Sequence, residues 1–358
     1  MGAADFVHLH LHTDFSLLDG ACDLSLLIDE TARRKTRAVA VTDHGNLFAA
    51  ANFYHEAVTK GVKPIIGCEV YVARGSRHEK TSDPEAPGAG RANHLLLLCE
   101  SNEGYRNLLK LVSAGFLEGF YYKPRIDHDL LAQHSRGLIA LSSCLRGEVA
   151  EALSEGKYDD ARAAAYRLRD IFGKGNFFLE VQDQGLEIEK RVNSDLARLS
   201  KETGIPLVAT NDCHYLTQAD SRAQEVLLCI QTGKTMSEPN RMRFATDQFY
   251  YKTPEEMARV FRELPDALER TVAIADRCHV KIERVANPFP EFQVPPGETA
   301  DSYFEKVTRL GFAERMPHLE AMAAQGRLRA PLAEYERRLS DEIEMIKQMR
   351  FSGYFLIV

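Results

Sequence analysis

The sequence predicts an α/β fold in which short parallel strands alternate with the helices that cover them. Two observations support this fold class. Short apolar runs recur over about the first 210 residues, and most are followed by a stretch with helical periodicity. Seven such runs favour a closed β/α barrel slightly smaller than the eightfold one. An open doubly wound sheet is the alternative, and the absence of a GxGxxG or GxxxxGK[ST] motif after any strand weakens its nucleotide-binding version.

The first predicted strand, FVHLHL, alternates histidines with apolar residues, whereas AVAVT and PIIGCEVYV, the next two, are almost entirely apolar. The later predicted strands are also short and mostly apolar: HLLLLC, GLIALS, FFLEV and PLVA. Between these runs the apolar residues recur with the spacing of an amphipathic helix. We therefore expect strands at residues 6–11, 38–42, 64–72, 94–99, 137–142, 177–181 and 206–209, and helices at residues 24–34, 49–60, 159–172 and 187–203.

The fourth strand fits a parallel barrel badly. His94 precedes its apolar run, so a parallel strand would carry this side chain to the end of the barrel opposite the other polar residues. The stretch before it, RGSRHEKTSDPEAPGAGRAN, is polar and contains several glycines and prolines. We expect a hairpin in which residues 69–73 run outward and residues 94–99 return antiparallel, which would bring Glu69 and His94 together.

Past residue 283 the residue composition of the sequence changes. NPFPEFQVPPGETADSY carries four prolines and a glycine, which is typical of a domain boundary. Helical segments follow at residues 302–315 and 332–349, and the chain stops at FSGYFLIV, an apolar run that resembles a strand. Because domains rarely end on an exposed hydrophobic strand, we expect a first domain at residues 1–283 and a truncated second α/β domain at residues 284–358.

Composition limits the classes of function. The net charge of −7 argues against a protein that coats DNA over its whole surface, although a local basic groove is compatible with it. No apolar run is long enough to span a membrane, and the N-terminus MGAADF has no secretory pattern. From the absence of such a run we expect no membrane partner. The seven cysteines include no CxxC pair, so we expect a reducing, cytoplasmic environment.

Side chains that bind metals gather where predicted strands meet the loops that follow them. Singly, each has an ordinary explanation: Asp-His after a strand is a common turn, and a lone cysteine is usually a small buried hydrophobic residue. The coincidence at nearly every strand favours a metal site at one rim of the barrel. Imidazole and carboxylate ligands suit Zn, Mn or Fe, and a thiolate favours zinc at one position. The candidates are His10, His12, Asp19, Asp43, His44, Glu69, His94, Cys144, Asp212 and His214.

Six ordered motifs carry a resemblance to a known family. HLHTDFSLLDG, AVTDHGN, PIIGCEVYV, GFYYKPRID, LIALSSCL and VATNDCHY together resemble the bacterial replicative DNA polymerase III alpha subunit, and specifically its N-terminal polymerase-and-histidinol-phosphatase (PHP) domain. MRFSGYFLIV resembles a segment early in the palm domain of that family. The resemblance implies a distorted sevenfold β/α barrel of PHP type, followed by the beginning of the palm. The catalytic aspartates of the palm would lie beyond residue 358.

The resemblance also implies a ligand set for up to three divalent metal ions. Asp19, Glu69 and Asp212 are the carboxylates expected to serve catalysis. Family members that retain the whole set act as metal-dependent 3′–5′ exonucleases, whereas others use the domain only for docking. By this resemblance His10, His12, Glu69 and Asp212 hold one ion, Glu69, His94 and Cys144 a second, and Asp19, His44 and His214 a third.

Side-chain chemistry suggests contacts to the substrate. Lys123 and Arg125 in YYKPRI are candidate phosphate anchors, with solvated loop charges as the alternative, and Tyr121 or Tyr122 is a candidate for stacking on a terminal base, with simple packing as the alternative. The partners follow from the resemblance. The expected partners are DNA primer-template, the sliding clamp, the clamp loader and a proofreading subunit, with Mg at the polymerase site of the full protein. Two alternatives remain: a phosphatase of the histidinol-phosphate type, and a non-catalytic domain that docks a separate proofreading subunit.

Overall fold

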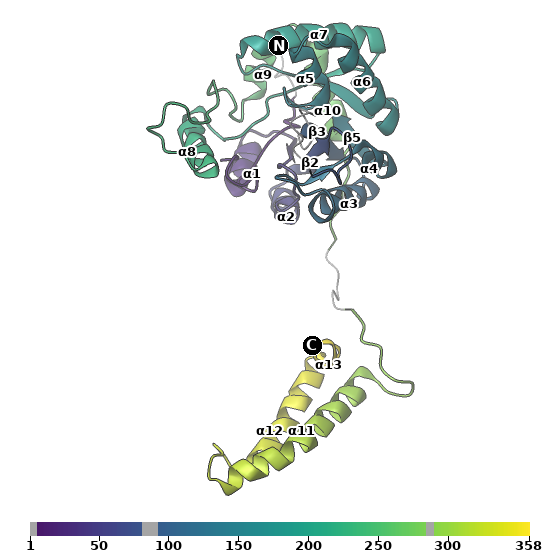
Figure 1. Ribbon diagram of the computed structural model, residues 1–358, viewed down its shortest axis with the longest axis vertical. Coiled ribbons are helices and arrows are strands. Elements are labelled where there is room, and N and C mark those ends of the chain that lie inside the picture. Colours follow the sequence, from purple (N-terminus) through teal and green to yellow (C-terminus); the bar gives the residue numbers. More distant parts are fainter. Residues whose placement is uncertain (1–5, 81–91, 284–289) are drawn as a thin grey trace. The chain divides into compact units, whose positions relative to one another are not determined.

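The computed structural model describes residues 6–80, 92–283 and 290–358. The chain forms two compact units, residues 1–282 and 283–358 (Figure 1). The predicted boundary between residues 283 and 284 falls at the edge of residues 284–289, which lie outside the described part. Residues 81–91, most of the polar stretch between the third and fourth predicted strands, lie outside it as well.

The first unit is built on one curled sheet. Its strands follow the order β1-β2-β3-β5-β6-β7, and a short strand, β4, pairs with β2 beside this path. Figure 1 shows helices surrounding the sheet, as expected for an α/β barrel. The strands are β1 (Ala38–Val41), β2 (Lys63–Ala73), β3 (Ala92–Cys99), β4 (Arg125–Ile126), β5 (Leu138–Leu141), β6 (Phe177–Gln182) and β7 (Leu207–Thr210).

An extended N-terminal segment joins the two ends of this sheet. On one side its carbonyl groups at His8 and Leu11 accept hydrogen bonds from β1 and the residue after it. On the other side His12 N donates to the carbonyl of Cys213, just after β7, and Cys213 N donates to that of His10. With this segment the six strands of the main path make seven members, which confirms the predicted sevenfold α/β arrangement. The two-residue strand β4 was not predicted.

The predicted hairpin is confirmed. β2 and β3 run antiparallel, with Glu69 opposite Leu96 and Tyr71 opposite His94. β3 is also antiparallel to β5, while the other strand pairs are parallel. The reversed direction of β3 therefore brings His94 to the same rim as the residues that follow the parallel strands.

Helix positions follow from caps and apolar spacing. In α1, the Asp23 side chain accepts a hydrogen bond from Leu26 N, and Leu24, Leu27 and Ile28 face the core at positions that share one side of a helix. No helix of the described residues is long and apolar enough to cross a membrane. The helices of this unit are α1 (Leu24–Arg33), α2 (Ala50–Thr59), α3 (Asn102–Leu117), α4 (His128–Gln133), α5 (Glu148–Ser154), α6 (Tyr158–Phe172), α7 (Glu187–Thr203), α8 (Ser221–Thr232), α9 (Pro254–Val260) and α10 (Pro265–Arg277).

The described part of the second unit consists of three helices, α11 (Ala300–Ala324), α12 (Leu332–Gln348) and α13 (Ser352–Ile357). The strand-like interpretation of FSGYFLIV is therefore wrong. A short apolar run cannot be assigned to strand or helix from its pattern alone. Here the rings of Phe355 and Phe304 lie 5.9 Å apart, so α13 packs on α11.

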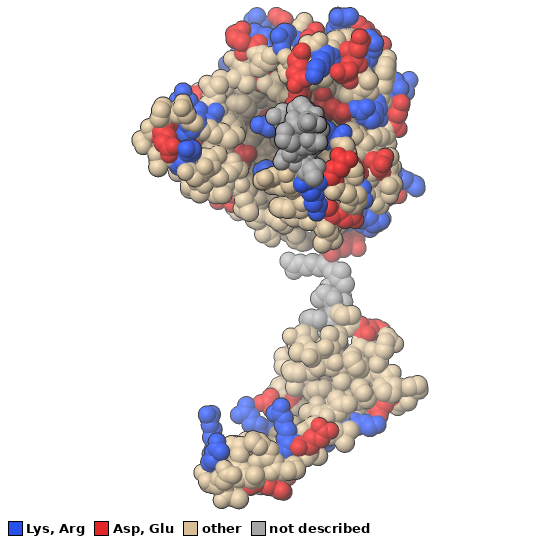
Figure 2. All heavy atoms as spheres, in the orientation of Figure 1, with Lys and Arg blue, Asp and Glu red and all other residues tan. Residues whose placement is uncertain are grey.

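Figure 2 shows Lys and Arg interspersed with Asp and Glu over the visible face of the first unit.

Candidate metal centre

Glu69 lies at the middle of the predicted ligands. Its side chain, on β2, is only 1% exposed. Its carboxylate oxygens lie 2.7 Å from His44 Nδ1, 3.1 Å from His94 Nδ1 and 3.3 Å from His10 Nε2. Ser143 Oγ, just after β5, donates a 2.5 Å hydrogen bond to Glu69. A single carboxylate thus faces imidazoles that come from three other segments of the barrel.

Asp212 and the two histidines of the N-terminal segment form a second group. Asp212 Oδ1 lies 3.2 Å from His10 Nε2 and 3.1 Å from His12 Nε2, and the two imidazole nitrogens are 3.1 Å apart. Asp212 has a φ of 49°, in the left-handed region that Asp and Asn tolerate better than most residues. The turn after β7 therefore aims this carboxylate back at the histidines.

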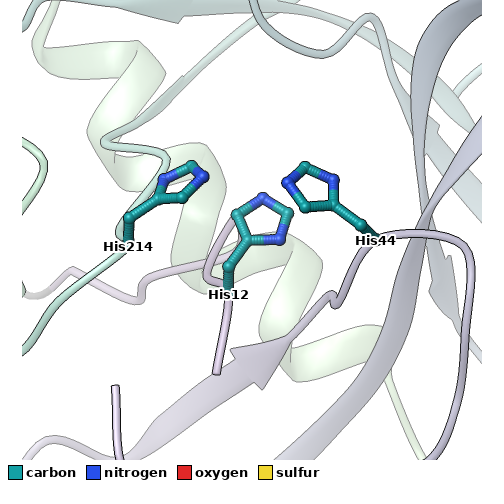
Figure 3. A group of neighbouring side chains, drawn as sticks. All are labelled: His12, His44 and His214. Carbon is teal, nitrogen blue, oxygen red and sulfur yellow. The ribbon is translucent and has the colours of Figure 1, made fainter. Parts of the chain in front are cut away.

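A third group contains His12, His44 and His214, whose rings lie side by side in Figure 3. The rings of His12 and His44 stack with centroids 3.9 Å apart, and His214 lies 4.5 Å from His12. Asp19 completes this corner: its carboxylate is 3.1 Å from His44 Nε2 and 3.9 Å from His214 Nε2. The described residues thus hold three groups of side chains that could bind metal ions, and His12 and His44 each belong to two of them.

Cys144 lies at the edge of the cluster. Its Sγ is 3.9 Å from Glu69 Oε1 and 3.8 Å from His94 Nδ1, so it borders the group formed by Glu69, His94 and His44. Burial, with the negative charges of Glu69 and Asp212, raises the pKa of the Cys144 thiol well above its usual range. A divalent cation would reverse this preference, because a coordinating thiol is deprotonated.

The site includes residues that the sequence analysis did not select. Glu180, on β6, is buried and its Oε1 lies 2.7 Å from His10 Nδ1. Thr210 and Gln182 also donate hydrogen bonds to the same oxygen. Contacts of this kind fix the ring orientation of a metal-binding histidine. The signal was a glutamate within the apolar run FFLEV, since a buried strand rarely carries an unpartnered charge.

Asp43 has a structural role in the same region. Its carboxylate accepts hydrogen bonds from the backbone and hydroxyl of Thr13 and from the hydroxyl of Ser16. It therefore ties the loop after the N-terminal segment to the end of β1. It is absent from the three groups that could hold metal ions, although it directly precedes His44.

Without cations, the ionisable groups of the cluster strongly perturb one another. Burial disfavours charge on all of them, but Glu69 and Asp19 raise the pKa of His44 to about 10. Burial, together with the nearby His44 and His214, lowers the pKa of His12 to about 3. Burial opposes ionisation of Asp212, yet His10 and His214 hold its pKa below the usual range. Carboxylates that stay ionised in a buried site are suited to cations.

The residues fit divalent metal ions. Glu69 Oε2, Asp212 Oδ1 and His44 Nδ1 are buried and make no hydrogen bond of normal geometry among the described residues, although Glu69 Oε2 lies 2.7 Å from His44 Nδ1 and Asp212 Oδ1 lies 3.1 Å from His12 Nε2. Buried polar atoms are normally hydrogen bonded, so such atoms indicate an absent ligand. The donors are imidazole nitrogens and carboxylate oxygens, a set that suits Zn, Mn and Fe.

A cavity of about 870 Å³ opens beside this cluster and is lined by Asp19, His44 and His94 together with basic and aromatic residues. Lys123 lines it, with its ammonium group 5.5 Å from the centre of the Tyr71 ring. The lining also contains Arg146, which the sequence analysis missed. The backbone carbonyl of Arg146 is held by His94 N and Asn93, but its guanidinium has no partner in the described part of the chain. The remaining lining residues are Arg74, Ala92, Tyr121, Tyr122, Arg125, Glu151, Gln231 and Met242.

Arg125 also borders the cavity, but it is only 1% exposed. Its guanidinium donates to the backbone carbonyls of Gly119, Arg77 and Glu79. These contacts give Arg125 a structural role in tying β4 to the chain after α3 and to the chain after β2. Its role as a phosphate anchor stays a prediction.

We expect Arg125→Met to lower the free energy of unfolding by about 2–3 kcal/mol, because it removes a buried charged donor and leaves three carbonyls without it. Urea denaturation of the metal-free chain measures this loss. Lys123→Met is the matched control, because Lys123 donates no hydrogen bond in the described structure and should leave the urea midpoint nearly unchanged. An unchanged midpoint for Arg125→Met would contradict the structural role.

Comparison with known proteins identifies the first unit. Residues 8–184 match the family model of the PHP domain, and this range contains His10, His12, Asp19, His44, Glu69, His94 and Cys144. The chain contains a PHP domain. Over its whole length it is 43% identical to DNA polymerase III subunit alpha of Treponema pallidum, covering 29% of that protein. It is 40% identical over 356 residues to the same subunit of Borreliella burgdorferi, covering 99% of this chain and 30% of that protein.

This similarity confirms the resemblance to the PHP region of the polymerase III alpha subunit that the motifs predict. The chain spans about three-tenths of the length of these curated relatives. Among solved structures, this chain is similar to a two-domain protein of Bacteroides vulgatus described as containing a "predicted PHP-like metal-dependent phosphoesterase". The TM-score is 0.35 at 13% identity, covering 79% of this chain and 72% of that one.

Proposed function

We propose that the PHP domain of this chain is a metal-dependent 3′–5′ exonuclease that acts on DNA within a polymerase III alpha subunit. One observation carries the proposal. The nine predicted ligands converge at one rim of the barrel, where the buried carboxylates of Glu69 and Asp212 face imidazole nitrogens at distances from 2.7 to 3.3 Å. A domain that served only for docking would have no need for buried carboxylates grouped in this way.

The residues that would hold the ions are those grouped by the structure, with Cys144 beside Glu69 and His94. When bound, divalent cations lower the pKa of a water molecule and offset the charge that develops on a phosphodiester. Glu180 and Ser143 serve as positioning residues, since they orient His10 and Glu69 by direct hydrogen bonds.

The walls of the cavity provide the contacts to DNA. Lys123 and Arg146 place positive charge beside the ligand cluster and are suited to backbone phosphates. Tyr122 is 82% exposed and lies at the same cavity, where its ring is available to stack on a terminal base. Basic side chains line the wall of this cavity and carboxylates lie at its base. The 3′-terminal phosphodiester of a DNA strand can therefore reach the ligand cluster.

For the whole protein we propose DNA-directed DNA synthesis, with residues 284–358 as the start of the palm. DNA primer-template, the sliding clamp, the clamp loader and a proofreading subunit are the proposed partners. The identity of this chain to DNA polymerase III alpha subunits over its full length supports this assignment.

The test compares three activities of the purified chain. Metal content is measured first, and release of a 3′-terminal label from a DNA primer is then followed with Mn²⁺ and with excess chelator. We expect bound metal and a chelator-sensitive release of the label. Release of phosphate from histidinol phosphate without attack on the primer would favour the phosphatase alternative. A chain that binds metal but cleaves neither substrate would favour the docking role.

Cys144→Ser is expected to lower the metal content by up to one ion and to reduce the rate of label release, because serine does not ionise near neutral pH as a coordinated thiol does. Metal analysis after dialysis and the primer assay measure both effects. Cys278→Ser is the control, because this buried cysteine packs in an apolar cluster, and its thiol contacts the carbonyl of Ile274 and none of the nine predicted ligands among the described residues. Unchanged metal content in Cys144→Ser would remove the thiol from the ligand set.

A further inference from the structure

A second cavity, of about 790 Å³, lies next to the metal centre but is lined by none of its nine predicted ligands. Its walls come from the start of α8 and from the chain between α8 and α9, and α8 lies at the left of the first unit in Figure 1. The lining residues are Tyr215, Ser221, Arg222, Gln224, Glu225, Arg243, Phe244, Ala245, Thr246 and Asp247.

The walls of this cavity are held in place by the rest of the fold. The guanidinium of Arg241 pairs with Glu225 at 2.6 Å, which ties the chain after α8 back onto that helix. Further along, His214 N donates to the carbonyl of Phe249, and Asn211 Nδ2 donates to the carbonyls of Gln248 and Tyr250. The cavity therefore has walls anchored both to α8 and to the turn that carries two of the predicted metal ligands.

Two guanidinium groups in the cavity are available to a ligand. Arg222 and Arg243 are exposed and have no hydrogen bond or ion pair within the described residues. The carboxylates nearby are already engaged: Glu225 pairs with Arg241, and Asp247 accepts hydrogen bonds from two glutamine side chains. The hydroxyl of Thr246 is buried and has no hydrogen-bond partner among the described residues. The unpaired groups thus favour an anionic ligand.

Two residues connect the cavity with the metal centre. Phe244 lines the cavity, and its ring lies edge-on to the imidazole of His214 with centroids 5.0 Å apart. Gln224 also lines it and is buried, and its Nε2 lies 3.5 Å from a carboxylate oxygen of Asp19. An aromatic ring beside unpaired guanidinium groups is the combination that binds single-stranded nucleic acid.

We propose that this cavity is a subsite for single-stranded DNA, in which Arg222 and Arg243 hold backbone phosphates and the ring of Phe244 stacks on a base. The subsite holds the strand whose 3′ end lies at the metal centre, so this inference rests on the proposed exonuclease function. It assigns the substrate class as a strand of several nucleotides rather than a small phosphate ester.

The experiment measures binding without cleavage. The 358-residue chain in excess chelator is titrated against a short fluorescein-labelled oligothymidylate, and fluorescence anisotropy is recorded at several salt concentrations. Arg222→Gln and Arg243→Gln should each reduce the slope of log affinity against log salt by about 0.7, the value for one phosphate contact on a single strand. Phe244→Ala should weaken binding by about 5- to 150-fold, the range for one stacked base.

Arg106→Gln is the matched control, since Arg106 is an exposed arginine of α3 that lies outside both cavities and has no partner in the part of the chain that the structure describes. It should bind the oligonucleotide with the affinity and salt slope of the parent chain. The double variant Arg222→Gln/Arg243→Gln tests the subsite independently of Phe244→Ala, whose effect on binding could come from a displaced His214. Unchanged affinity and slope in that double variant would overturn the subsite. So would equal displacement of the oligonucleotide by thymidine monophosphate, which would assign the cavity to free nucleotides.

The two proposals can fail separately. If the parent chain releases no 3′ label with Mn²⁺ while the arginine variants lose affinity in chelator, the exonuclease function is wrong and the strand-binding subsite stands. If label release is metal-dependent and the arginine variants bind normally, the exonuclease function stands and the subsite is wrong.

Discussion

Asp212→Asn is expected to lower the rate of 3′ excision by several orders of magnitude and to weaken binding of the metal ion shared with His10 and His12. The substitution keeps the shape of the side chain but removes a negative charge whose oxygen lies within 3.2 Å of both imidazoles. Asparagine also tolerates the left-handed backbone at this position, so the turn after β7 should be retained. The measurement is label release at saturating Mn²⁺, together with metal content.

Asp160→Asn is the control for Asp212→Asn. Asp160 is an exposed residue in the first turn of α6 and belongs to none of the groups that could hold a metal ion. Circular dichroism should be the same for both variants and the parent. If Asp212→Asn folds normally and excises at the parental rate, Asp212 is only a turn residue and the assignment of three ions loses its best-defined group.

Glu69→Gln is expected to have the larger effect on metal content, with the loss of more than one ion. Its carboxylate faces His10, His44 and His94, so one substitution removes charge from more than one group. Glutamine can still accept the hydrogen bond from Ser143, but its amide nitrogen then faces imidazoles that need an anion. Metal analysis after dialysis and the primer assay measure the change, and excision should fall below detection.

Glu263→Gln provides the comparison, because Glu263 is 85% exposed and outside the barrel rim. It should keep the parental metal content and excision rate. Retention of the full metal content by Glu69→Gln would mean that the carboxylate serves only to balance charge among the histidines. The ligand groups would then have to be drawn without it.

Much of the barrel could be predicted because its strands are short apolar runs set off by polar helices. Direction was also predictable at β3, since His94 at the start of its run was incompatible with a parallel strand. The cluster itself followed from topology: ligands that are distant in sequence meet because strand ends share one rim. The same reasoning leaves His8 out of the ligand set, because this residue precedes the end of the strand. Its Nε2 contacts the carbonyl of Lys252.

Other features depended on tertiary contacts that the sequence pattern does not contain. Arg125 looks like a free surface cation in YYKPRI, but three backbone carbonyls surround it in the fold. Glu180 is hidden within an apolar run and contacts His10 only after β6 and the N-terminal segment meet. The terminal run became a helix because α11 offers it an apolar surface, which a residue pattern alone does not specify.

The hydrogen bonds between the N-terminal segment and Cys213 have a consequence for how the protein folds during synthesis. His10 leaves the ribosome early, whereas Asp212 and His214 follow about 200 residues later. At ~5–20 residues per second, this interval is about 10–40 s. Throughout it the first strand has only β1 as a sequence-local neighbour, and joining it to β7 requires the closure of a very long loop. The metal centre therefore forms last, because its ligands come together only when the barrel closes.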